Sequence, residues 1–105
     1  MSTLKSQISS KKFHDATKII GDAYILNIIA QLSLRSMRFN ELQRSVPDIC
    51  PATLTDRLKK LEQEQIIIRE EETVDKVSVV YNLTPKGKAM LPVIKALNLF
   101  SKNFI

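Results

Sequence analysis

Apolar residues recur at helical spacing through the first third of the chain. Between Ala23 and Leu34, four of them fall at positions i, i+3, i+4 and i+7 and predict a helix with one buried stripe: Ile25, Ile28, Ile29 and Leu32. An earlier helix, starting near Phe13, is predicted to end at Gly21, because glycine commonly terminates helices. The chain therefore begins as a helical protein.

A short helix, a turn and a longer helix follow. Residues 38–45 are predicted as the short helix, and the turn over 46–48 contains Pro47, which disfavours helical backbone at the residue before it. The longer helix is predicted to run from Pro51 to Gln65, since a proline at the first helical position forfeits no hydrogen bond. Its inner face is predicted to be made of leucines: Leu54, Leu58 and Leu61.

Two β-branched runs around a polar turn predict a β-hairpin over 66–68 and 77–83. Thr84 would then cap a last helix that holds Pro85 at its first position. Four apolar residues repeat along this helix at i, i+4, i+7 and i+11: Val93, Leu97, Phe100 and Phe104. This stripe either packs back on its own domain or forms a dimer interface. We expect a dimer interface, with Phe13 as part of it.

The order of these elements predicts a mainly α fold with one β-hairpin: a winged helix-turn-helix with an extra C-terminal dimerisation helix. Residues 1–11 are polar, include four serines and are expected to form a flexible N-terminal arm. Residues 12–105 would form one winged-helix domain for DNA binding and dimerisation. A chain of 105 residues buries only about 65% of the surface that its unfolded form exposes. That fraction favours a homodimer, in which a second copy covers more apolar surface.

Basic and acidic residues are unevenly distributed along the chain. The net charge of +5 divides into ten basic against five acidic residues over 1–61, one against six over 62–75, and five against none over 76–105. Because neutralised phosphates release counterions, a basic excess favours nucleic acid as the partner. Lysine-rich surfaces are also common on proteins that bind none, so the charge alone does not decide the function.

The sequence offers little for catalysis, metal binding or membrane insertion. One cysteine, Cys50, and one histidine, His14, can neither form an internal disulfide nor complete a zinc site. Paired carboxylates, a nucleophilic triad and a glycine-rich phosphate loop are absent from the sequence. No apolar run approaches the roughly 18 residues that cross a bilayer, and the start of the chain has no secretory signal. We expect a cytoplasmic protein that is not an enzyme, uses no cofactor and binds no membrane, with Cys50 half-buried in a turn.

A helix that follows a helix-turn is placed to enter the DNA major groove, which makes 51–65 the predicted recognition helix. Arg57 and Lys60 would bind phosphate or guanine, while Arg38 and Asn40 would contact the backbone. The remaining predicted contacts to double-stranded DNA lie on the same helix and on the hairpin: Pro51, Thr53, Thr55, Asp56, Lys59 and Lys76. A homodimer would read a pseudo-palindromic operator. The alternative is that these basic residues only solvate a helix whose other face is leucine.

Four stretches of the sequence resemble one family. They are residues 20–24, the Arg-Phe-Asn-Glu-Leu run at 38–42, residues 49–61, and residues 79–87, which end in Leu-Thr-Pro-Lys-Gly. Together these stretches are similar to the HxlR-type transcriptional regulators, dimeric winged-helix proteins of bacteria and archaea, and the resemblance runs from about Phe13 to Phe100. It implies a dimeric DNA-binding regulator. The second and fourth stretches together are specific to this family, whereas either stretch alone is not.

The chain departs from that family at three places. Family members commonly carry Gly-Gly-Lys-Trp where residues 21–24 are Gly-Asp-Ala-Tyr. Redox-sensing members carry Cys-Pro just before the first helix, where this chain has Lys11 and Lys12, so the resemblance implies that the sensing thiol is missing. The usual Pro-Pro-Arg of the wing is replaced by Lys-Val-Ser at 76–78, preceded by three glutamates at 70–72.

The acidic hairpin leaves two questions about function open. Either the hairpin tilts so that only Lys76 meets DNA, which we expect, or the glutamates weaken DNA binding. The second possibility allows another function, a winged-helix protein–protein interaction module with lost or weak DNA binding. The basic recognition helix favours the regulator. A small-molecule effector is compatible with a regulator, but the sequence does not identify one.

Overall fold

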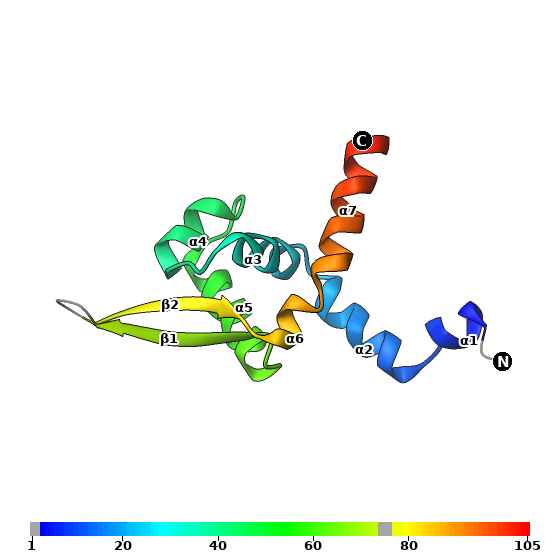
Figure 1. Cartoon of the computed structure of the whole chain (residues 1–105), viewed down its shortest axis with the longest axis horizontal. Coiled ribbons are helices and arrows are strands. Elements are labelled where there is room, and N and C mark those ends of the chain that lie inside the picture. Colours follow the sequence, from blue (N-terminus) through cyan, green and yellow to red (C-terminus); the bar gives the residue numbers. More distant parts are fainter. Residues whose placement is uncertain (1–2, 74–76) are drawn as a thin grey trace.

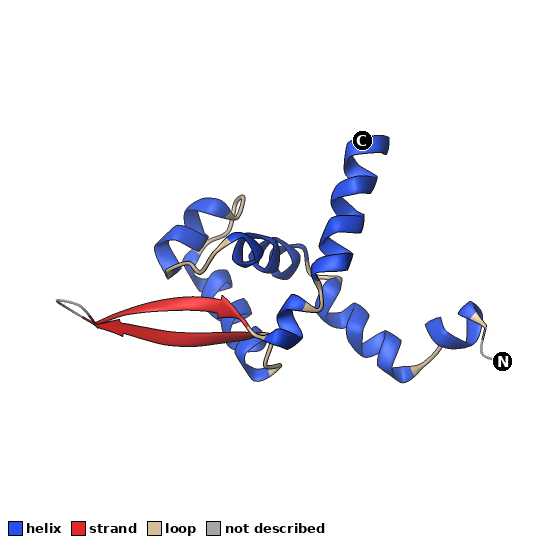
Figure 2. Ribbon diagram, in the orientation of Figure 1, coloured by secondary structure: helices blue, strands red, loops and turns tan. Residues whose placement is uncertain are grey.

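The computed structural model describes residues 3–73 and 77–105. In this part of the chain seven helices and two strands follow one another (Figure 1): α1 (Leu4–Ile8), α2 (Lys11–Ile20), α3 (Ala23–Leu34), α4 (Phe39–Ser45), α5 (Pro51–Gln63), β1 (Ile67–Thr73), β2 (Val77–Leu83), α6 (Pro85–Lys88) and α7 (Leu91–Phe104). The helices and the single hairpin confirm the predicted winged helix-turn-helix (Figure 2).

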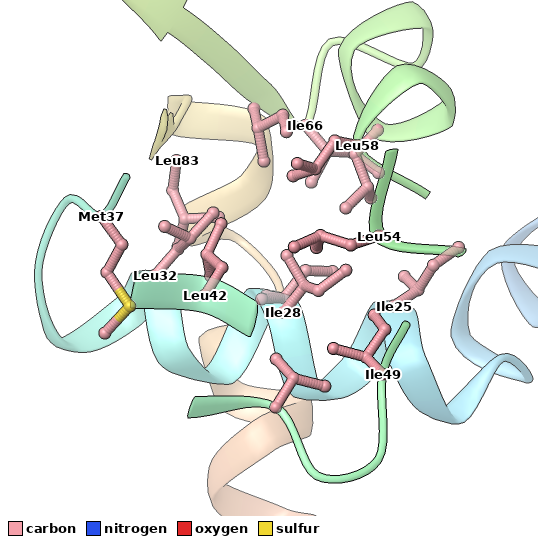
Figure 3. Packing of buried hydrophobic residues seen from close by; sticks show 14 residues of the cluster. Ile25, Ile28, Leu32, Met37, Leu42, Ile49, Leu54, Leu58, Ile66 and Leu83 are labelled. Atoms are coloured by element: carbon pink, nitrogen blue, oxygen red, sulfur yellow. The ribbon is translucent and has the colours of Figure 1, made fainter. Parts of the chain in front are cut away.

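The core lies where α3, α4, α5 and the base of the hairpin meet (Figure 3). The α3 stripe and the three leucines of α5 are all buried, as their spacing predicted. The same cluster contains seven more buried apolar residues: Met37, Leu42, Val46, Ile49, Ile66, Ile67 and Leu83. Burying a large aliphatic side chain contributes about 1.5–3 kcal/mol. The leucine face of α5 therefore fixes how this helix sits against the body and which side it turns outward.

Three helices project from this body. Figure 1 shows α7 rising away from the core, while α2 and α1 extend in another direction toward the N-terminus. Neither α2 nor α7 contains a buried residue. The radius of gyration is 15.5 Å, whereas a compact domain of this length has about 13 Å. The elongated shape leaves the apolar side chains of these helices largely open to contact.

The hairpin is tied to the helix-turn-helix by a short β-bridge. β1 and β2 are antiparallel, with Ile67 opposite Leu83 at the buried end. Met37, between α3 and α4, pairs with Tyr81 of β2: the Tyr81 N–H donates to the Met37 carbonyl at 2.7 Å, and the Met37 N–H donates to the Tyr81 carbonyl at 3.1 Å. The base of the wing is thereby held in a defined place beside α4 and α5.

The Leu-Thr-Pro-Lys-Gly segment closes the base of the wing. Thr84 caps α6 as predicted, because its Oγ1 accepts a hydrogen bond from the Gly87 N–H at 3.1 Å. The same hydroxyl donates to the Gln65 carbonyl at 2.6 Å. Gly87 lies so close to the backbone carbonyl of Ile66 that any Cβ at this position would collide with it. The motif therefore joins the end of α5 to the C-terminal helices.

One long helix after Thr84 was predicted, and this was wrong. α6 ends at Lys88, and α7 begins at Leu91. Pro92, within the first two residues of α7, has no N–H to bond to the carbonyl four residues earlier, and its ring would clash with that carbonyl. The break lets α7 leave the body in its own direction.

A short helix forms within the segment 1–11, whose flexibility stays a prediction. α1 forms there because Thr3 and Ser6 make a capping box, in which the Ser6 N–H donates to Thr3 Oγ1 at 3.3 Å and the Thr3 N–H donates to Ser6 Oγ at 3.1 Å. Ser10 caps α2, which already begins at Lys11. Residues 3–18 are all exposed, so caps rather than packing define these helices.

Candidate functional site

α5 turns a polar surface away from the core. The helix begins at Pro51 as predicted, but it ends two residues before Gln65, whose left-handed φ of 60° is incompatible with a continuing helix. Several predicted contact residues on α5 are exposed: Pro51, Thr55, Asp56, Lys59 and Lys60. Thr53 is half-buried. Most of the side chains predicted to meet DNA are thus accessible from solvent.

Arg57 is half-buried and bonded to two carboxylates. Its Nε donates to Asp22 Oδ2 at 2.8 Å, and its Nη1 donates to Asp56 Oδ2 at 2.6 Å. The guanidinium carbon lies 6.0 Å from the centre of the Tyr24 ring, and the arginine side chain is 23% exposed. The sequence predicted that Arg57 binds phosphate or guanine. In this arrangement Arg57 ties α5 to the start of α3 through Asp22, and its contact with DNA stays a prediction.

The ionisation of this cluster is set by the same contacts. Burial raises the pKa of Asp22, but the hydrogen bond from the Ile25 N–H and the hydrogen bond and charge of Arg57 outweigh it and leave the pKa below its ordinary value. The hydrogen bonds that Arg57 donates to Asp56 and Asp22 outweigh burial and raise the pKa of Arg57. Asp56 Oδ2 is also 3.6 Å from Lys60 Nζ. Asp56, a predicted base contact, therefore neutralises its neighbours on α5.

Arg38 connects the start of α4 to the wing. Its backbone N–H donates to Glu41 Oε1 at 3.0 Å, and its Nη2 donates to Glu72 Oε2 of β1 at 3.1 Å. Glu41 also accepts from Arg35 Nη1 at 2.8 Å, and the Arg38 N–H together with Arg35 lowers the pKa of Glu41. Asn40, the other predicted backbone contact on α4, is exposed. The guanidinium of Arg38 is accessible but already faces a carboxylate.

The glutamates of the wing divide between the two faces of the hairpin. Side chains alternate along a strand, so Glu70 and Glu72 share one face and Glu71 shares the other with Arg69. All of them are exposed, and Glu72 is paired with Arg38. Lys76, predicted to contact DNA from the wing, lies outside the described residues. The hairpin tilt predicted from the sequence is therefore untested.

A groove of about 310 Å³ separates α5 from the wing. Its lining combines apolar and charged side chains: Phe39, Thr55, Leu58, Lys59, Glu62, Arg69 and Tyr81. The sequence interpretation did not single out Arg69. The sequence nevertheless indicated that Arg69 faces the body of the protein, because strand alternation places it on the same face as the buried Ile67.

Cys50 is exposed, which corrects the half-buried position predicted for it. It is the N-cap residue of α5 and directly follows the buried Ile49. A hydrogen bond between Thr53 Oγ1 and Cys50 Sγ, 3.2 Å apart, lowers the pKa of this thiol, and the N–H groups of Thr53 and Ala52 add to the effect.

The residues predicted for a dimer interface are all exposed large hydrophobics: Phe13, Val93, Leu97, Phe100 and Phe104. The rings of Phe100 and Phe104 lie 5.4 Å apart on α7. A second apolar feature, a groove of about 620 Å³, separates α3 from α7. An exposed stripe of this kind on a single helix is typical of a protein interface.

The residues that the structure describes form neither a membrane-spanning helix nor a metal-binding cluster. None of the helices there combines the length and the hydrophobicity needed to span a bilayer. In the same residues, no three His, Cys, Asp or Glu side chains come together as a metal site. His14 is exposed, with its ring 6.3 Å from that of Phe13.

Comparison with known proteins gives consistent matches over nearly the whole chain. The model of the HxlR-like helix-turn-helix family matches residues 19–105. The uncharacterized HTH-type transcriptional regulator YvaP of Bacillus subtilis is 31% identical over 94 residues, which cover 90% of this chain and 87% of YvaP. The HTH-type transcriptional regulator YodB of Bacillus subtilis is 32% identical over 93 residues, which cover 89% of this chain and 83% of YodB.

Solved structures agree with these matches. The reduced form of YodB superposes with a TM-score of 0.80 at 32% identity, covering 90% of this chain and 93% of that one. A putative MarR-family regulator from Porphyromonas gingivalis W83 superposes with a TM-score of 0.84 at 28% identity, covering 100% of this chain and 98% of that one. The chain therefore belongs to the HxlR-like helix-turn-helix family and is a DNA-binding transcriptional regulator.

Proposed function

We propose that the chain acts as a homodimer whose two copies of α5 enter successive major grooves of a pseudo-palindromic operator. The observation that carries this proposal is the outward face of α5, where Thr55 and Lys59 are exposed beside the wing while the leucine face is locked in the core. Recognition helices related by a two-fold axis read half-sites about 34–36 Å apart. Thr55 would then contact base edges, with Lys59, Lys60 and Asn40 on the backbone.

The dimer part of the proposal rests on α7. Leu97 and Phe100 are 49% and 54% exposed on a helix with no buried residue. Covering such side chains with a second copy removes apolar surface from water, at about 25 cal/mol per Å². α2, which also has no buried residue, carries the exposed Phe13 that was predicted for the same interface.

Light scattering and DNA binding test the two parts separately. We expect the wild-type protein to have the mass of a dimer at micromolar concentration and Leu97→Asp to be a monomer. Leu99→Asp is the matched control, because Leu99 is exposed on α7 but lies outside the stripe. A monomeric wild type, or equal dissociation by both variants, contradicts the dimer interface.

Operator binding is tested with genomic fragments recovered on the purified protein. Lys59→Ala should weaken binding by about 1–3 kcal/mol. Lys88→Ala, an equal charge change on an exposed residue of α6 that does not line the α5–wing groove, should leave the affinity unchanged. Unchanged affinity in the Lys59 variant would contradict the entry of α5 into the major groove.

The exposed glutamates of β1 favour a second candidate, a protein–protein interaction module with weak DNA binding. A pulldown on DNA at two salt concentrations distinguishes the two functions, because phosphate contacts make DNA binding fall steeply with salt. Retention on DNA at low salt alone supports the regulator; no retention at either concentration supports the module. The regulator that we propose acts by binding DNA in the cytoplasm, not by catalysis, and a small-molecule effector would act on this binding.

A further inference from the structure

Two cations of the α5–wing groove have no counter-ion in the residues that the structure describes. Four nearby cations are each paired with a carboxylate: Arg35, Arg38, Arg57 and Lys60. Lys59 and Arg69 make neither an ion pair nor a side-chain hydrogen bond within that part of the chain, although both line the same groove. Each wall of the groove therefore carries one unpaired positive charge, that of Lys59 on the helix and that of Arg69 on the strand.

The groove is built by regular elements. Thr55, Lys59 and Glu62 are spaced at i, i+4 and i+7 and so share one stripe of α5. Arg69 faces this stripe because the register places it opposite Tyr81, on the face that begins with the buried Ile67. The cations are thus positioned by a helix and a bridged hairpin rather than by a loop.

We propose that this groove is a binding site for one phosphodiester of the DNA backbone, held between Lys59 and Arg69. The walls carry two positive charges and one negative charge, that of Glu62, so one phosphate leaves the site neutral. A bidentate guanidinium and an ammonium are the groups that bind phosphate in proteins. The apolar part of the lining, which includes Phe39 and Tyr81, suits the less polar face of the adjoining sugar.

The site deepens the proposed function and rests on it. A duplex that places its major groove on α5 has its backbone at the edge of that groove, on the side where the wing begins. The phosphate would be read without regard to sequence and would set the register of α5 on the duplex. A free phosphate ion offers the same chemistry, so the experiment must also measure the binding of inorganic phosphate.

The salt dependence of DNA binding tests the site. Arg69→Gln should weaken binding to the operator and to unrelated DNA by the same factor, and should reduce the slope of log K against log salt by about one per subunit. Lys88→Gln, with the same charge change outside the groove, should keep the wild-type slope. Glu62→Gln should strengthen binding. A wild-type slope in Arg69→Gln, or an equal loss in Lys88→Gln, overturns the proposal.

Neutral methylphosphonates placed singly along the operator locate the phosphate. At one backbone position per half-site the substitution should weaken binding by the wild type but not by Arg69→Gln. Equal sensitivity of both proteins at every position overturns the site even where operator binding is intact, whereas failure of the wild type to select any operator overturns the proposed function. Inorganic phosphate that shifts the Arg69 amide resonance, without any change in DNA salt slope in Arg69→Gln, would assign the groove to a free anion and overturn the backbone site.

Discussion

The ion pair between Asp22 and Arg57 should stabilise the fold and orient α5 at the same time. Asp22 caps α3 through a 3.1 Å hydrogen bond from the Ile25 N–H to Oδ1, and it holds Arg57 through Oδ2. Asn caps a helix about as well as Asp, so Asp22→Asn removes the negative charge and keeps the cap. Asp22→Ala removes both the charge and the cap. The two substitutions therefore separate the two roles.

The expected losses follow from the geometry. A lost cap costs about 1 kcal/mol. Exposed ion pairs contribute about 0.2–1 kcal/mol and the loss of one partner from a buried pair costs about 3–5 kcal/mol. The side chains of Arg57 and Asp22 are 23% and 24% exposed, and water screens that fraction, so we expect about 1 kcal/mol for the charge. Asp22→Asn should lower the free energy of unfolding by about 1 kcal/mol and Asp22→Ala by about 2 kcal/mol.

Urea unfolding followed by circular dichroism, at one protein concentration, measures both variants. Because the folded-state pKa of Asp22 is lowered, its stabilisation is present above the unfolded pKa of about 3.9 and is lost as the pH falls through the folded pKa. The difference between wild type and Asp22→Asn should therefore vanish in acid. In a double-mutant cycle with Arg57→Gln, the coupling should be about 1 kcal/mol. A coupling near zero at neutral pH would refute the reasoning.

Three further outcomes are expected. Glu72→Gln should strengthen operator binding more than Glu71→Gln, because only Glu72 occupies Arg38 and competes with phosphate there; equal gains in a binding titration would contradict this. Gln65→Gly should raise the free energy of unfolding by about 0.5–1 kcal/mol, since the left-handed φ costs about 1–2 kcal/mol and glycine costs about 0.5–1 kcal/mol in entropy; a loss on urea unfolding would contradict it. Cys50 should react faster with iodoacetamide in the folded than in the urea-unfolded protein, because its folded pKa is lowered, and bound DNA should slow the reaction; equal folded and unfolded rates would contradict the lowered pKa.

Two differences between expectation and structure had local signals in the sequence. Pro92 stands in the middle of the predicted last helix, where its missing N–H and its ring divide the helix into α6 and α7. Thr3 and Ser6 have the spacing of a capping box, with Thr3 directly before Leu4, and a helix begins at Leu4. In both places the residues that set the backbone conformation are neighbours in the chain. The sequence alone was therefore enough to predict the helix break at Pro92 and the helix after Thr3.

The sequence by itself determined the elements and their inner faces. The α3 stripe and the leucines of α5 are buried as their spacing required, because the period of a helix fixes which side chains share a face. The same regularity, joined to the Arg-Phe-Asn-Glu-Leu and Leu-Thr-Pro-Lys-Gly motifs, was sufficient for the winged helix and its family.

Only the tertiary structure decided which charges are free. Arg57 finds Asp22 across 35 positions of the chain, and Arg38 finds Glu72 across 34. Lys59 and Arg69 come to line one groove only when the hairpin packs beside α5. A side chain's type and helical position are local properties, but its counter-ion is set by where distant segments meet. For this reason the carboxylate partners of Arg57 were not predicted, and Arg69 was overlooked.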